Sequence, residues 1–96
     1  MRADYDSRAD SLSIELIKVD SLAHGVDDIE GVVVHVHADR PAVIDVLDAS
    51  EGFDEKLKAV ASRYQLDEDA LLGIGHTAIV NPDRTVLLEI LEKQLA

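Results

Sequence analysis

YDSRADSLSIEL, residues 5–16, is the stretch that decides the fold. A turn rich in carboxylates, with Asp6 and Asp10, leads into a strict alternation of polar and apolar side chains. Successive side chains of a strand point to opposite faces of a sheet, so the alternation predicts a half-buried strand that follows a tight turn. One face carries the apolar residues Leu12, Ile14 and Leu16, and the other carries Ser11, Ser13 and Glu15.

Further stretches predict the rest of an antiparallel sheet. Arg2–Tyr5 reads as a short strand before the turn, and the strand that begins at Ser11 is expected to reach about Val19. Gly31–Asp39 places valines on one face and mainly histidines on the other, and Ala42–Leu47 follows a predicted turn at residues 38–41. Short strands at hairpin spacing favour a meander of about four strands, with VIDVLDAS (43–50) closing the sheet. The polar connection at 20–30 predicts no definite element.

The second half of the chain predicts two helices that cover this sheet. Asp67 is a suitable N-cap for the second of them, which is expected to run to about Val80 and to stop at Asn81-Pro82. The sequence therefore predicts one α+β domain, residues 1–96, with a β-sheet half (1–50) and a mainly helical half (51–96). The first helix is predicted from five residues at the spacing of one helix face: Phe53, Leu57, Val60, Ala61 and Tyr64.

Two features of the helical half allow alternatives. Gly73 and Gly75 each cost about 1 kcal/mol in a helix interior relative to alanine, so they indicate either close packing or a break. The tail, residues 84–91, fits a strand slightly better than a helix because its start is rich in β-branched residues. Either form exposes more apolar surface than a monomer needs, so Leu87, Leu88 and Leu91 are predicted to bind a partner.

The charge of the chain bounds its partners. There are 20 acidic residues against 9 Lys and Arg, a net charge of −11. This charge repels phosphate backbones, so no direct nucleic-acid binding is expected, whereas a basic protein suits it. Solubility alone is an equally simple explanation of the charge. A small aliphatic core also favours self-association, so a homo-oligomer is expected.

Cysteine content and hydropathy narrow the class further. The chain has no cysteine, which excludes disulfides, thiolate metal sites and cysteine nucleophiles. No apolar run approaches the ~20 residues that span a bilayer, and the N-terminal residues do not resemble a signal peptide. We therefore expect a soluble protein of the cytoplasm.

Histidines provide the one candidate metal site. His35 and His37 stand two residues apart on one predicted strand, so both imidazoles point to the same face. Two imidazoles at this spacing can share a metal ion, with Asp39 as a third ligand. His24 or His76 could also complete the site. The alternative is two half-exposed polar residues on the solvent face of a strand.

Other patterns give weaker signals. Asp6 and Asp10 could form an acidic pair, but aspartates in turns usually bond nearby amides. Residues 58–78 resemble a helix-turn-helix, yet carboxylates at 67–69 stand where a DNA-reading helix needs Arg, Lys, Asn or Gln. Gly73–Thr77 lacks the ending of a phosphate loop, and no serine has the spacing of a catalytic triad. We predict no catalytic residue and no cofactor.

The first half of the chain resembles a known family. Tyr5-Asp6, Ala9-Asp10 and the strand after them, a valine-rich strand, and Leu47–Ser50 follow the order typical of the bacterial family catalogued as domain of unknown function 2283. The resemblance covers roughly residues 1–50, while Asp39-Arg40-Pro41 replaces the usual Asp and Gly of the third turn, and residues 53–96 lie outside it. It implies a small antiparallel sheet. Because members often sit beside genes for small toxin-like nucleases, it also implies an antitoxin-like role.

Three functions follow as hypotheses. The first is an acidic protein-binding module that docks a basic protein, favoured by the charge, the apolar tail and the resemblance. The second is a small metal-binding protein or metal-dependent enzyme that uses His35 and His37. The third is a homodimeric structural subunit with no activity of its own.

Overall fold

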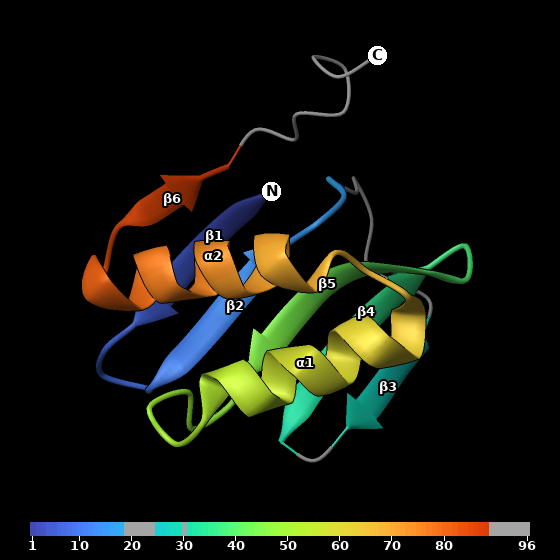
Figure 1. Ribbon diagram of the computed structural model, residues 1–96, viewed down its shortest axis with the longest axis horizontal. Coiled ribbons are helices and arrows are strands. Elements are labelled where there is room, and N and C mark those ends of the chain that lie inside the picture. Colours follow the sequence, from blue (N-terminus) through green and yellow to red (C-terminus); the bar gives the residue numbers. More distant parts are fainter. Residues whose placement is uncertain (19–24, 30, 89–96) are drawn as a thin grey trace.

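The computed structural model describes residues 1–18, 25–29 and 31–88. One antiparallel sheet carries both helices on a single face, so the predicted α+β class is confirmed (Figure 1). None of the helices in these ranges is long and apolar enough to cross a membrane. The strands are β1 (Arg2–Asp6), β2 (Ser11–Glu15), β3 (Gly25–Ile29), β4 (Val32–His37), β5 (Arg40–Val46) and β6 (Thr85–Leu87), and the helices are α1 (Phe53–Tyr64) and α2 (Glu68–Val80).

The strands lie in the order β3-β4-β5-β2-β1-β6, and every neighbouring pair is antiparallel. We predicted that β5 closes the sheet, and this is wrong. β5 lies inside the sheet, between β4 and β2. The meander therefore holds for β3, β4 and β5, whereas β2 pairs with β5 instead of with the next strand along the chain. Two strands enlarge the predicted sheet: β3, in the polar connection, and β6, in the ambiguous tail.

Two boundaries differ from the prediction for local reasons. β2 ends at Glu15 because the amides of Leu16 and Ile17 share one carbonyl, that of Ala42, at 2.7 and 3.2 Å, so the regular ladder stops there. Val19 lies outside the described residues. The β4–β5 turn is shorter than predicted: Ala38 and Asp39 alone form it, with φ of 52° and 64°. Positive φ at both positions is typical of a two-residue hairpin loop.

Pro41 lies in β5 and not in the turn. It pairs with Val36 beside a shift in register between β4 and β5. Proline is tolerated in a sheet near such irregularities because it has no amide hydrogen for the ladder. On its other side the pairing of β5 with β2 ends at Val43, so Pro41 breaks no regular pair there.

The core lies between the sheet and the two helices. α1 contacts β3 and β5, while α2 contacts β1, β2 and β6. The predicted stripe of α1 is confirmed, since its three central residues are buried and the two end residues, Phe53 and Tyr64, pack against the core. The buried apolar residues are Ala3, Leu12, Ile14, Val32, Val34, Ala42, Ile44, Val46, Ala49, Leu57, Val60, Ala61, Leu71, Ile74 and Ala78.

The second helix follows the predicted boundaries. Asp67 caps its start, where the side chain accepts a hydrogen bond from the Ala70 amide at 3.1 Å. Gly75 does not break the helix. A Cβ at this position would lie 2.8 Å from Cδ1 of the buried Leu57, so the glycine allows α1 and α2 to pack closely.

Candidate functional site

At the predicted metal site, His35 pairs with an aspartate that the prediction did not include. His35 on β4 places Nε2 2.8 Å from Oδ2 of Asp45 on β5. Within residues 1–18, 25–29 and 31–88, no three His, Asp or Glu side chains are grouped so that they could hold a metal ion. His24 lies outside these ranges, and His76 is exposed on α2, far along the sequence from β4. The structure thus joins His35 to Asp45 and does not assemble His35, His37 and Asp39 into a ligand set.

Asp10 is the centre of a hydrogen-bond cluster that joins two loops. Its carboxylate accepts bonds from the Tyr5 hydroxyl at 2.7 Å, the Ser50 amide at 2.9 Å and the Ser50 hydroxyl at 2.5 Å. Its carbonyl accepts a further bond from the Ala49 amide at 2.9 Å. Asp10 therefore fastens the β1–β2 turn to the segment between β5 and α1. We call Tyr5, Asp10 and Ser50 the Asp10 cluster.

The Asp10 cluster gives a structural reason for the Tyr-Asp, Ala-Asp and Asp-Ala-Ser residues noted in the sequence. Asp6 makes the predicted turn, because Oδ1 accepts bonds from the amides of Arg8 and Ala9 at 3.0 and 3.2 Å. Asp10 reaches beyond its own turn, which the sequence did not predict. These bonds join protein groups to one another and hold the two loops together.

The bonds to Asp10 stabilise its charged form. The Ser50 hydroxyl contributes most and the Tyr5 hydroxyl next, and together they hold the pKa of the Asp10 carboxyl below its usual range. The hydrogen bond between Tyr5 and Asp10 also raises the pKa of the Tyr5 hydroxyl. An aspartate whose pKa is lower in the folded chain stabilises the fold above its unfolded pKa, near 4, and loses that contribution as the pH falls through the folded value.

We therefore predict that Asp10→Asn lowers the melting temperature at neutral pH, and that the difference from the parent shrinks as the pH falls below about 4. Asparagine keeps the size of the side chain but not its charge. Thermal unfolding followed by circular dichroism between neutral and acidic pH measures both effects. Glu51→Gln, an exposed neighbour of the cluster, is the matched control. An Asp10→Asn chain as stable as the control at neutral pH would contradict the structural role of the cluster.

Two more aspartates fasten the ends of the sheet. Asp83 accepts bonds from the Ser7 amide and hydroxyl at 3.0 and 2.7 Å, so the chain after α2 is held against the β1–β2 turn. Asp27 on β3 accepts bonds from the Tyr64 hydroxyl and from Nε of Arg63, both at 2.6 Å. The Tyr64 bond contributes most to the lowered pKa of Asp27. The first set of contacts holds the segment just before β6, and the second ties the edge strand β3 to α1.

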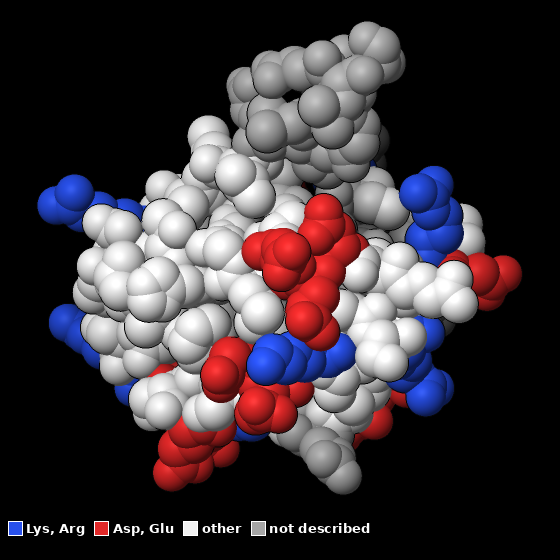
Figure 2. Space-filling view, viewed as in Figure 1, with Lys and Arg blue, Asp and Glu red and all other residues white. Residues whose placement is uncertain are grey.

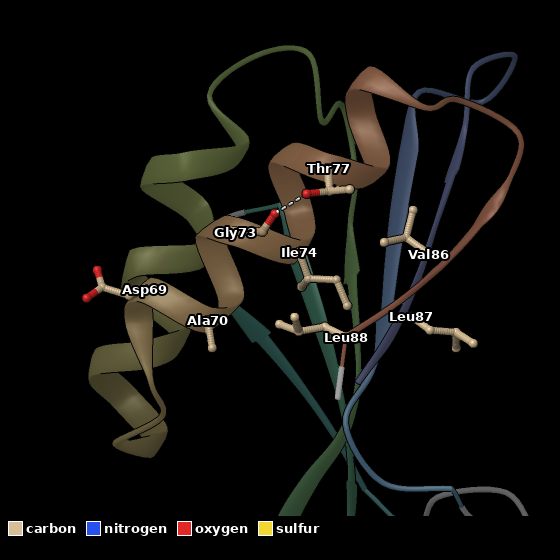
Figure 3. A pocket seen from close by; sticks show the side chains of 8 residues that line it. All are labelled: Asp69, Ala70, Gly73, Ile74, Thr77, Val86, Leu87 and Leu88. Atoms are coloured by element: carbon tan, nitrogen blue, oxygen red, sulfur yellow. Dashed lines mark hydrogen bonds between the residues drawn. The ribbon is translucent and has the colours of Figure 1, made fainter. Parts of the chain in front are cut away.

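An apolar groove lies between α2 and β6. Its volume is about 360 Å³, and Figure 3 shows Val86 and Leu88 pointing toward α2 while Leu87 points away from it. Leu88 is 38% exposed, so the groove is open to solvent. The Thr77 hydroxyl donates a hydrogen bond to the Gly73 carbonyl at 2.8 Å. Because this bond already engages the hydroxyl within the helix, the groove lining is largely apolar. The lining residues are Asp69, Ala70, Gly73, Ile74, Thr77, Val86, Leu87 and Leu88.

Charge is distributed unevenly on the helix-bearing face. Acidic atoms gather over the starts of α1 and α2, and the surface over the rest of α2 and over β6 carries almost no charged atoms (Figure 2). The acidic residues in the first turns are Asp54 and Glu55 of α1 and Glu68 and Asp69 of α2. A helix dipole favours anions there, which accounts for their position locally. They also leave the apolar groove with a carboxylate, that of Asp69, on its lining.

The structure shows where the other sequence candidates lie. Gly73–Thr77 belongs to the interior of α2, so it forms no phosphate loop. Leu87 and Leu88 lie on or next to the edge strand β6, while Leu91 falls outside the described residues. The sequence missed the bonds of Ser50, Asp45 and Asp83, because each depends on which distant segment the fold brings beside it. A pattern of residues along one strand gives no signal for such contacts.

Comparison with known protein families, with curated proteins and with solved structures gives no match for this chain.

Proposed function

We propose that this chain is a protein-binding module of the cytoplasm that docks a basic protein on its helix-bearing face. The observation that carries the proposal is the open apolar groove between α2 and β6, with exposed carboxylates at the adjoining start of α2. Monomeric proteins rarely leave an apolar surface uncovered unless a partner binds there. The same surface offers both an apolar contact and a negative charge.

The two parts of this surface suit different parts of a partner. A groove of about 360 Å³ has room for an apolar side chain, and a buried apolar anchor supplies most of the affinity in many interfaces. Glu68 and Asp69, both exposed, would attract Lys or Arg near that anchor. Exposed carboxylates mainly raise the rate of association and make it sensitive to salt. The expected partner is therefore basic and presents an apolar residue among its cations.

The resemblance of residues 1–50 to the family described above supports one kind of partner. Its members often neighbour genes for small toxin-like nucleases, and such nucleases are basic because they bind phosphate backbones. We extend the proposal to an antitoxin-like role on this ground. The sheet that carries the resemblance would then act as the support, and the helical half would provide the contact surface.

Affinity capture from the native host at low salt, followed by mass spectrometry, tests the proposal. We expect one basic protein at near-equal amount, released as the salt concentration rises. The double variant Glu68→Lys and Asp69→Lys should lose that protein. Its control is Glu15→Lys with Asp28→Lys, which changes the net charge equally but on the opposite face of the sheet and should retain the protein.

Two results would count against this function. If no basic protein is retained by the parent chain at low salt, the module has no such partner in that host. If both double variants lose the protein equally, net charge alone governs capture and the groove is not the docking site. Leu88→Ala distinguishes the contribution of the groove from that of Glu68 and Asp69, because it reduces the apolar lining without altering charge.

A further inference from the structure

Among residues 1–18, 25–29 and 31–88, no strand pairs with the outer edge of β6. The Met1 amino group donates to the Leu88 carbonyl at 2.8 Å, and the Leu88 amide donates to the Met1 carbonyl at 2.9 Å. Residues in an antiparallel pair alternate between bonded and non-bonded positions. Ala3 and Val86 therefore form the next bonded pair, and the amides and carbonyls of Thr85 and Leu87 point away from β1. β6 ends the order of the described strands, so none of them covers this edge.

The opposite edge of the sheet, β3, is protected in a way that β6 is not. β3 has carboxylates at Asp27 and Asp28 among its five residues. Charged side chains on an edge strand oppose pairing with another chain. Two copies of β3 would bring these carboxylates together. β6 has the sequence TVL, followed by Leu88, with no charged side chain among them.

Charge also restricts where two copies of this chain could meet. Each copy carries a net charge of −11, so a contact between copies needs a surface without carboxylates. α2 has no charged residue between Asp69 and Asp83. Its exposed residues in this interval include Thr77 and Val80, and Val80 is 59% exposed. This uncharged part of α2 lies beside β6, where Figure 2 shows few charged atoms.

We infer that a second copy of this chain pairs with β6, antiparallel, about a two-fold axis that passes beside Val86. In this register Thr85 faces Leu87 of the second copy, and the two residues exchange both backbone hydrogen bonds. Val86 faces its own counterpart in a non-bonded pair, where side chains come closest. The strand is self-complementary because Thr85 and Leu87 are the two residues whose backbone groups point outward.

The pairing extends the surface proposed above without depending on it. A two-fold axis perpendicular to the sheet leaves the α2 helices of both copies on the same face, so the two grooves lie next to each other across the axis. Leu87, 74% exposed in one copy, gains a neighbouring strand. A basic partner could then contact two grooves and two acidic helix starts.

Sedimentation of the full chain and of two proline variants tests the pairing. We expect the parent to sediment as a dimer, Leu87→Pro as a monomer, and Val26→Pro as a dimer. Proline at 87 removes an outward amide hydrogen and leaves the bonds to β1 in place. Val26 is the matched position on β3: the Gly31–Leu47 bond fixes the alternation in β4, so the Val26 amide also points outward.

A cysteine cross-link measures the register directly. The chain has no cysteine, so a single Val86→Cys substitution adds the only thiol. Cβ atoms in a non-bonded pair lie about 4.5–5.5 Å apart, close to the distance that a disulfide spans. Mild oxidation should therefore convert Val86→Cys to a covalent dimer. Val80→Cys, more exposed but away from the axis, should remain largely unlinked.

Each outcome decides the inference separately from the proposed function. A monomeric parent, a dimer that survives Leu87→Pro, or equal cross-linking at 80 and 86 would overturn the pairing. Circular dichroism of Leu87→Pro shows whether the subunit stays folded; if it does not, the cross-link alone decides. If the chain is a dimer but captures no basic protein, the proposed function is refuted and the pairing stands. If the chain is a monomer that captures a basic protein, the pairing is refuted and the proposed function stands.

Discussion

Truncation of Leu57 to alanine is expected to lower the free energy of unfolding by about 2–5 kcal/mol. The side chain is fully buried on α1, and its Cδ1 atom lies against the backbone of α2 at Gly75. The substitution removes apolar surface from the core and leaves a cavity that fixed secondary structure cannot fill. Domains of this size are stable by only about 5–15 kcal/mol, so the loss is a large part of the total.

The melting temperature should fall by roughly 8–40 °C, since each kcal/mol corresponds to about 4–8 °C in a domain of this size. Urea unfolding followed by circular dichroism gives the free energy, and a thermal scan gives the temperature. Leu47→Ala is the matched control because it is the same substitution at a residue that is 45% exposed and lies just after β5. Its effect should stay within about 0.5 kcal/mol. Equal effects at 57 and 47 would show that α1 does not pack on the sheet as described.

The periodicity of the sequence predicted most of the layers of this fold. Leu12 and Ile14 are fully buried, and Ser11 and Ser13, which alternate with them, face the other side of the sheet, as the alternation in β2 required. The stripe of α1 and the Asp67 cap were equally readable, because each is set by neighbours within one or two turns. Local patterns of this kind report directly on which face is buried.

Strand order could not be read in the same way. β5 pairs with β2 across more than twenty intervening residues, and nothing in either strand specifies the other as its neighbour. β3 escaped detection because Asp27 and Asp28 are adjacent, which places one carboxylate on each face and removes the alternation. Asp27 lies opposite the buried Val34 and therefore on the helix side, where Arg63 and Tyr64 bond it.

The candidate site likewise combines features that local sequence predicts with features that depend on the tertiary structure. The exposed leucines of the tail were predicted as a contact surface from their excess over what a small core covers. The groove itself required α2 to lie beside β6, which is a property of the tertiary structure. For a similar reason, the described residues do not bring His35, His37 and Asp39 together as metal ligands: spacing along β4 placed His35 correctly, but its partner, Asp45, is set by the register with β5.

Substitution of Gly75 by valine is expected to destabilise the chain by about 2–3 kcal/mol. A Cβ at 75 would lie 2.8 Å from Leu57 Cδ1 and 3.4 Å from atoms of Leu12 and Phe53, so the added methyl groups have no free space. Overpacking of this kind costs about 1–3 kcal/mol, and occasionally more. Valine forms helix slightly better than glycine, which offsets only a few tenths of a kcal/mol. Urea unfolding measures the difference.

Gly73→Val is the control for the same substitution in the same helix. A Cβ at 73 meets no atom within 4 Å, so this variant should be as stable as the parent or slightly more stable. A double variant tests the cause of the Gly75 effect: in the Leu57→Ala background the clashing methyl group is absent, and Gly75→Val should then cost less than it does alone. Strictly additive effects would mean that α1 and α2 do not meet at these residues. Coupling between them would establish that the glycine allows the close approach of the two helices, and this approach fixes the position at which α2 and β6 enclose the groove.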